Sequence, residues 1–165
     1  MNEERKKKLT ALLQIAMCAA IYTVLCLVLQ PLSFGPIQFR FSEILCLLAI
    51  DHKWALWGCI LGCFISNTFF GGLGIIDIVF GTLATAIGCL LAYHYRNHRI
   101  KGYPILSTLM IVLANAIIIG IELAYILDSK DQVWLFMIQV GIGELTVLGI
   151  GLLFYKRINS LINKK

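Results

Sequence analysis

Long polar stretches are missing from this sequence. Only 14% of its 165 residues are Asp, Glu, Lys or Arg, while 59% are hydrophobic, and the mean hydropathy is +0.86. Soluble domains carry about 25% charged and about 45–50% apolar residues. The composition therefore predicts an integral membrane protein. Because a helix needs about 20 apolar residues to cross a bilayer, the chain has room for about five or six crossings and little else.

Recognisable catalytic motifs are also absent. Glycines loosen the backbone at residues 71–74, but no Gly-x-x-x-x-Gly-Lys loop follows, and the chain has no His-Glu-x-x-His or Gly-x-Ser-x-Gly segment. Such motifs hold a nucleotide, a zinc ion or a nucleophilic serine. The three histidines, His52, His94 and His98, lie in or beside expected turns. We therefore expect neither enzymatic activity nor a cofactor.

The cysteines form no Cys-x-x-Cys pair, which disfavours a disulfide framework or a zinc knuckle. Cys59 and Cys63 would share a helix face, but no histidine or carboxylate stands beside them at ligand spacing. We predict that all six are small core residues and bind no metal: Cys18, Cys26, Cys46, Cys59, Cys63 and Cys89.

The net charge of +5 could suggest a nucleic-acid partner, but its distribution favours a topology signal. Most basic residues stand in short clusters beside apolar runs, at residues 5–8, 53, 96–101, 156–157 and 164–165. Loops that stay in the cytoplasm carry such an excess of Lys and Arg. With six crossings and a cytoplasmic N-terminus, every cluster is cytoplasmic, and only Arg40 and Lys130 lie outside. We expect an all-α, six-transmembrane-helix bundle with both termini cytoplasmic.

The hydrophobic pattern predicts helices over residues 9–29, 41–50, 54–70, 104–127 and 132–155, and one from Asp77 to the basic cluster at 96–101. The first apolar run exceeds the about 7–15 residues of a cleavable signal peptide, so we expect it to be retained. The helix over 41–50 is about 15 Å long, too short to span, and should leave a depression on the outer side. Residues 31–38 hold two prolines and a glycine, which predicts an irregular outer loop over that depression.

Small residues at four-residue spacing mark two faces for close helix packing. Gly58, Gly62 and Ser66 form one. Ala16 and Ala20 form the other, which contacts either the protein's own helices or another protein.

Polar residues inside apolar helices are costly and usually face a cavity or a partner. Carboxylates outnumber cations among them, and such a cavity prefers a ligand rich in N–H donors or positive charge. A purine-like base or a cationic amine fits this better than an anionic vitamin. The candidate binding residues are Arg40, Glu43, Asn67, Asp77, Asn115, Glu122, Gln139 and Glu144, and the candidate stacking residues are Phe39, Phe41, Phe80, Tyr125 and Trp134.

Two of these assignments have simpler alternatives. Arg40 and Glu43, three residues apart, could be a surface pair whose long side chains reach the membrane interface. Asp77 could simply stabilise the positive end of its helix dipole.

Two segments resemble the QueT family, whose members are substrate-binding S components of energy-coupling factor (ECF) transporters. They are Phe39-Arg40-Phe41-Ser42-Glu43 and the glycine-rich stretch from Ser66-Asn67 to Gly81-Thr82-Leu83-Ala84-Thr85. The likeness extends over essentially the whole chain, so we expect residues 1–165 to form a single transmembrane S-component domain.

The resemblance implies a multi-pass protein of the bacterial cell membrane that takes up a queuosine precursor, either queuine or a pre-queuosine 7-deazaguanine. It also implies partners, namely a membrane-embedded scaffold subunit and two ATPase subunits. Ala16 and Ala20 match the Ala-x-x-x-Ala pattern through which such components contact the scaffold. We expect Glu43 or Asp77 to bind the base and its substituent.

Two other functions remain open from the sequence. The chain could be an S component for another small vitamin-like or cationic ligand, or a membrane enzyme or structural partner protein.

Overall fold

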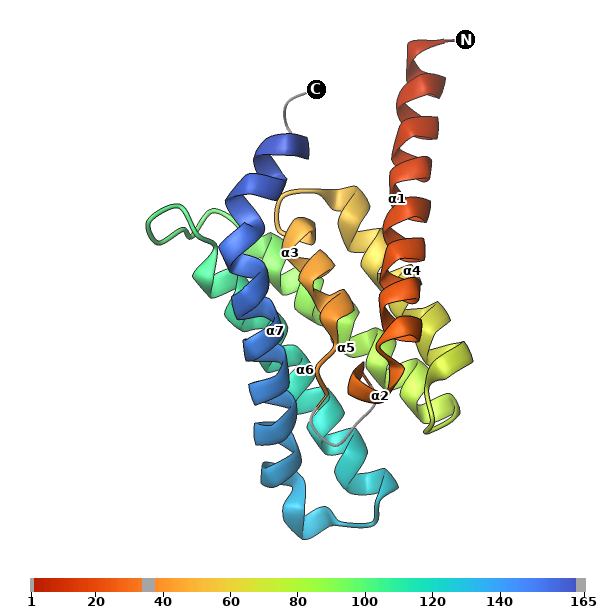
Figure 1. Ribbon diagram of the computed structural model, residues 1–165, viewed down its shortest axis with the longest axis vertical. Coiled ribbons are helices and arrows are strands. Elements are labelled where there is room, and N and C mark those ends of the chain that lie inside the picture. The colour runs from red at the N-terminus through yellow and green to blue at the C-terminus, as the bar shows by residue number, and fades with distance from the viewer. Residues whose placement is uncertain (1, 34–37, 163–165) are drawn as a thin grey trace.

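A computed structural model describes residues 2–33 and 38–162, and within these residues the secondary structure is helical (Figure 1). The elements are α1 (Glu3–Val28), α2 (Gln30–Ser33), the 3-10 turn η1 (Phe41–Leu45), α3 (Cys46–Ala49), α4 (Lys53–Phe70), α5 (Ile75–His94), α6 (Ile105–Ile126), the 3-10 turn η2 (Lys130–Gln132) and α7 (Val133–Ile162).

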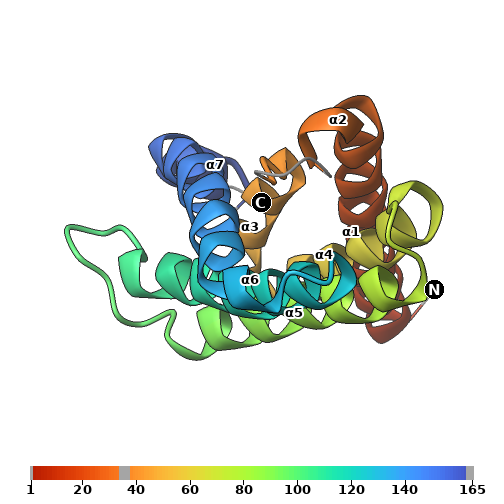
Figure 2. The same cartoon turned by 90° about the horizontal axis from the view of Figure 1, so that it is seen from below.

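The chain runs back and forth along one axis (Figure 1). From the end where it begins, α1 runs away, η1 and α3 return, α4 runs away, α5 returns, α6 runs away and α7 returns. We call the end with the start of α1 and the last turns of α7 the basic end. The other, the opposite end, holds α2, the α4–α5 loop and η2. Because η1 and α3 together contact α1, α4, α5 and α7, they form the inner piece that the long helices surround (Figure 2).

The helix boundaries correct the sequence prediction in three places. Helix α1 begins at Glu3 rather than at residue 9, and α7 continues to Ile162 rather than ending at 155. Pro31 lies within the short helix α2, so the expectation of irregular backbone is wrong for residues 31–33, because proline is tolerated in a first helical turn. Residues 34–37 of that segment lie outside the described residues. The short second helix is confirmed, although η1 makes its first half a 3-10 turn.

Helices α1 and α4 pack closely because α4 presents glycine to α1. A Cβ added at Gly58 would lie 2.5 Å from Cys18 Cβ, and one at Gly62 would lie 2.7 Å from Tyr22 Cβ. Neither position accepts a larger residue without moving α1. This confirms the predicted close-packing face, where buried Ser66 donates a hydrogen bond of 2.7 Å to the Gly62 carbonyl.

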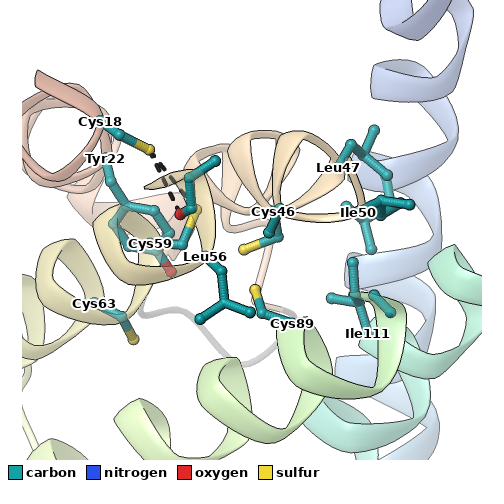
Figure 3. Close-up of a cluster of buried hydrophobic side chains, with 14 of the residues drawn as sticks. Cys18, Tyr22, Cys46, Leu47, Ile50, Leu56, Cys59, Cys63, Cys89 and Ile111 are labelled. Carbon is teal, nitrogen blue, oxygen red and sulfur yellow. Dashed lines mark hydrogen bonds between the residues drawn. The ribbon is translucent and has the colours of Figure 1, made fainter. Parts of the chain in front are cut away.

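The core between these helices is rich in thiols. All six cysteines are free and buried, which confirms their prediction as core residues. Figure 3 shows several of them among Tyr22, Leu47, Ile50 and Ile111. The Cys18 and Cys59 sulfurs lie 3.9 Å apart, which is a packing contact. The thiols thus fill the bundle between its two ends.

At the basic end, Asp51 joins three separate parts of the chain. Its Oδ1 accepts a hydrogen bond from Arg99, and its Oδ2 accepts one from the Tyr155 hydroxyl and one of 2.7 Å from Asn159 Nδ2. His52 contacts the same Asn159 side chain at 2.9 Å. Although partial burial alone would lower it, the pKa of Arg99 is raised by Tyr155 and Asp51. The α3–α4 turn, the α5–α6 loop and α7 are therefore fastened together here.

Within residues 2–33 and 38–162, four helical segments are long and apolar enough to cross a membrane, judged by length and composition: α1, α5, α6 and the continuous run Lys130–Ile162.

Candidate functional site

Glu43 lies at the centre of the inner piece, and its carboxylate is fully occupied by the protein itself. The residue is completely buried. Its Oε1 accepts hydrogen bonds from the Tyr22 hydroxyl of α1 and, at 3.1 Å, from Thr85 Oγ1 of α5, while the Cys46 thiol lies 3.0 Å from Oε2. Both oxygens therefore have donors before any ligand arrives.

Arg40 is the cation of the site and is equally enclosed, with 2% of its surface exposed. Because Glu43 is also buried, the two are not a pair reaching the membrane interface. One guanidinium nitrogen, Nη1, lies 3.8 Å from Cys63 Sγ. Arg40 also interacts electrostatically with all four carboxylates that the sequence singled out: Glu43, Asp77, Glu122 and Glu144.

Asp77 and Asn67 form the second part of the site, where the glycine-rich segment bends around them. Asn67 Nδ2 donates a hydrogen bond of 3.1 Å to the Asp77 carbonyl. A Cβ at Gly81 would overlap Asn67 Nδ2, and one at Gly71 would overlap the Asp77 carboxylate. The glycines are therefore required because these two polar side chains occupy the space that a larger residue would need.

Several buried acceptor atoms have no hydrogen-bond partner among residues 2–33 and 38–162. A buried polar atom without a partner costs about 1–3 kcal/mol, so each of these atoms is a candidate to accept a hydrogen bond from a ligand. They include Asn67 Oδ1, Asp77 Oδ2, both carboxylate oxygens of Glu122, Gln139 Oε1 and Glu144 Oε2.

Asp77 lines a cavity of about 510 Å³ at the opposite end, which we call the main cavity. It is bordered by α2, the α4–α5 loop, the end of α6 and the start of α7, and a small heterocycle fits this volume. The lining residues are Gln30, Pro31, Gln38, Phe70, Gly72, Leu73, Asp77, Leu123, Leu127 and Phe136.

Other residues selected from the sequence lie elsewhere. Asn115 is buried in α6, where its Nδ2 bonds the Ile111 carbonyl of its own helix at 3.2 Å. Glu122 lines a separate groove between α5 and α6, together with Phe80 and Tyr125. Trp134 is 74% exposed.

The main cavity has aromatic residues, but not the ones chosen from the sequence. None of Phe39, Phe41, Phe80, Tyr125 and Trp134 is among its described lining residues, whereas Phe70 and Phe136 are. Sequence reasoning also missed Gln30, and the position of Gln30 beside Pro31 at the end of the first helix was the available signal.

Tyr22, Thr85 and Cys46 were missed as partners of Glu43. Thr85 lies eight residues after Asp77 on α5, where both residues are buried, so the helical period could have found it. Nothing in the sequence pairs Tyr22 with Glu43.

Comparisons with known proteins identify the family of the chain. Residues 12–160 match the model of a family described as QueT transporter. A curated relative, the queuosine precursor transporter QueT of Lactococcus lactis subsp. cremoris (strain MG1363), is 36% identical over 85 residues. That match covers 50% of this chain and 49% of the relative, so it spans about half the length of each. No solved structure matches the chain.

Proposed function

The chain belongs to the QueT transporter family, and on this premise we propose that it binds a queuosine precursor for uptake across the bacterial cell membrane. The proposed ligand is a 7-deazaguanine, either queuine or the aminomethyl pre-queuosine base. The name of the Lactococcus relative supports this choice, and so does the chemistry of the site.

The observation that carries the proposal is a set of buried acceptor oxygens without described partners, one of which belongs to Asp77 in the lining of the main cavity. These oxygens can accept hydrogen bonds but can donate none when the carboxyls are ionised. They are Asp77 Oδ2, Asn67 Oδ1 and Glu144 Oε2. A 7-deazaguanine presents a ring N–H and an exocyclic amine on one edge, and these donors match an acceptor pair. An ammonium on its substituent would satisfy a further carboxylate, which favours the aminomethyl base over an uncharged analogue.

Titration of the purified protein with queuine, the aminomethyl base, guanine, thiamin and riboflavin tests this proposal. We expect saturable calorimetric binding of the two deazapurines and much weaker binding of guanine, which lacks the cationic substituent. Saturable binding of thiamin or riboflavin, with none of either deazapurine, would contradict the proposal and favour an S component for a different vitamin.

We further propose that the chain works as the S component of an ECF transporter, with a membrane scaffold subunit and two ATPase subunits. Ala16 and Ala20 support this, because both are exposed on α1 and not covered by the protein's own described helices. Small residues at this spacing let another helix approach closely.

Copurification from cells that express all subunits tests the partnership. Ala16→Leu and Ala20→Leu should abolish recovery of the scaffold subunit. Gly149→Leu is a matched control, because a Cβ at Gly149 meets no atom within 4 Å and lies on α7. Equal recovery from all three variants would exclude α1 as the contact face.

The proposed topology has six crossings, with the basic end in the cytoplasm. The alternation of the helices and the concentration of Lys and Arg at one end support it. In this topology α4, at 18 residues or about 27 Å, is a span, and η1 with α3 forms the short second crossing. Reporter fusions after residues 98 and 129 should report the cytoplasm and the exterior, respectively, and the same side for both would refute it.

A further inference from the structure

A groove on the outside of the bundle, between α5 and α6 near the opposite end, is separate from the main cavity. Its volume is about 570 Å³, and among the described residues it shares no lining residue with the main cavity. Ile76 and Phe80 of α5 line it, together with Ile121, Glu122, Tyr125 and Ile126 of α6.

The groove opens on the outer surface. Ile76, Phe80 and Tyr125 are 49%, 43% and 64% exposed, and apolar side chains exposed on a membrane protein of this family face lipid. The molecules that reach this groove are therefore the lipids of the bilayer.

Glu122 is the one carboxylate among the described lining residues, and it has no described hydrogen-bond partner. The residue is only 4% exposed, and neither carboxylate oxygen has a hydrogen-bond partner in the described part of the chain. A carboxylate in apolar surroundings is stable only with a donor or a positive charge. Arg40 attracts this carboxylate electrostatically but donates no hydrogen bond to it. Lipid acyl chains have no donors, so the occupant needs a polar group bearing N–H donors.

The depth of Glu122 matches the headgroup region of a bilayer. Helix α6 ends at Ile126, four residues or about 6 Å beyond Glu122. The exposed Tyr125 lies between the two, and tyrosine is enriched at the membrane interface. An ammonium of a lipid headgroup reaches this depth.

A positive charge lies just beyond the groove. Lys130 Nζ is 5.3 Å from the centre of the Tyr125 ring, and Lys130 forms no ion pair with any residue that the structure describes. Passing outward, the groove therefore offers a carboxylate, an aromatic ring and an ammonium. A headgroup that lies along the surface with its amine turned inward meets a charge of opposite sign at each end, the carboxylate at its ammonium and the lysine at its phosphate.

We propose that the α5–α6 groove binds one phospholipid whose headgroup carries a primary amine, as phosphatidylethanolamine does. Its ammonium donates hydrogen bonds to Glu122, its phosphate lies near Lys130, and its acyl chains follow Ile76, Phe80 and Ile121. The proposal is independent of the transported ligand, because it concerns a groove outside the main cavity.

Lipid retention by the wild-type protein tests the headgroup. The protein is reconstituted in nanodiscs of phosphatidylethanolamine, phosphatidylcholine or phosphatidylglycerol with identical acyl chains, and the lipids that remain bound are counted by native mass spectrometry. We expect about tenfold stronger retention of one phosphatidylethanolamine. Phosphatidylcholine has no N–H donor for Glu122, and phosphatidylglycerol has no cation. Equal retention of the three lipids overturns the proposal.

A pair of variants tests the position. Glu122→Gln should remove the preference for phosphatidylethanolamine, whereas Asp131→Asn, an exposed acid in the neighbouring turn, should keep it. If Glu122→Gln keeps the lipid preference but weakens deazapurine binding, Glu122 belongs to the transported ligand and the proposal is wrong. If the groove is covered only when the scaffold subunit is bound, it is a protein interface, and the lipid proposal is also wrong.

Discussion

Asp51 at the basic end and Asp77 at the opposite end use their carboxylates in contrasting ways. Asp51 accepts hydrogen bonds from Arg99, Tyr155 and Asn159, so both of its oxygens have partners. Asp77 lines the main cavity, and its Oδ2 has no partner among the described residues. The first carboxylate fastens three segments together, whereas the second is available to a ligand.

The same contrast, between a carboxylate with partners and one without, is found within the candidate site. Glu43 was selected together with Asp77, but it behaves like Asp51, because Tyr22, Thr85 and Cys46 occupy both of its oxygens. The sequence offered Glu43 and Asp77 as equal candidates for binding the base. We propose Asp77 as the ligand-facing residue and Glu43 as the residue that holds α1, the inner piece and α5 in position.

The largest expected effect is that of Glu43→Gln on stability. The change removes a negative charge near buried Arg40 and puts an amide where three donors point. We expect the free energy of unfolding to fall by about 3–5 kcal/mol, measured by denaturation in mixed micelles. Glu3→Gln, at an exposed ion pair on α1, is the control. If Glu43→Gln is as stable as that control, the contrast between paired and unpaired carboxylates fails.

Asp77→Asn should show the reverse pattern. We expect ligand binding to weaken by about 1–3 kcal/mol, with little change in unfolding free energy, because Oδ2 has no described partner to lose. Calorimetry and denaturation on the same preparation measure both quantities, and Asp128→Asn in the exposed turn is the control. Unchanged affinity would remove Asp77 from the ligand site.

Tyr22→Phe isolates one donor of the Glu43 network. The ring stays in place while the hydroxyl is lost, so we expect a loss of about 1.5 kcal/mol in unfolding free energy, typical of a hydrogen bond to a charged group. Tyr125→Phe, at a tyrosine that is 64% exposed, should have almost no effect on stability. Equal stability of the two variants would mean that the Tyr22 hydroxyl does not hold Glu43.

Asp51→Asn should have the smallest effect, about 1 kcal/mol in unfolding free energy. The Arg99 and Asp51 side chains are 32% and 18% exposed, so water and salt weaken their attraction. We expect the difference from wild type to shrink when denaturation is repeated at high salt. Ligand affinity should stay unchanged, and a loss as large as that of Asp77→Asn would show that the two ends are not separate in function.

The helices could be predicted from the sequence because apolar runs and glycine spacing are local signals. The ends of the helices could not be predicted, since the length of an apolar run reflects the thickness of the membrane and not the length of the helix. In α1 the charged residues before the apolar run also form helix, where Lys6 pairs with Glu3 at 3.3 Å and Lys8 with Glu4 at 2.8 Å. Such pairs at three- and four-residue spacing stabilise a helix in water.

The polar residues of the site could be selected from the sequence, but their roles could not. Helical periodicity shows which residues share a face, but not which neighbouring helix that face meets. Glu122 therefore looked equivalent to Asp77, although it lines the α5–α6 groove and not the main cavity. Tyr22 reaches Glu43 only because Gly62 lets α1 approach α4, which is a property of the packed bundle.

The burial of all six native thiols has a practical consequence. A cysteine introduced at an exposed position outside the apolar runs, such as Lys7 at the start of α1 or Asp131 in η2, would be the fastest to react with a maleimide dye under mild conditions. The wild-type chain thus serves directly as a background for attaching a single fluorophore or spin label, without first replacing the thiols that fill its core.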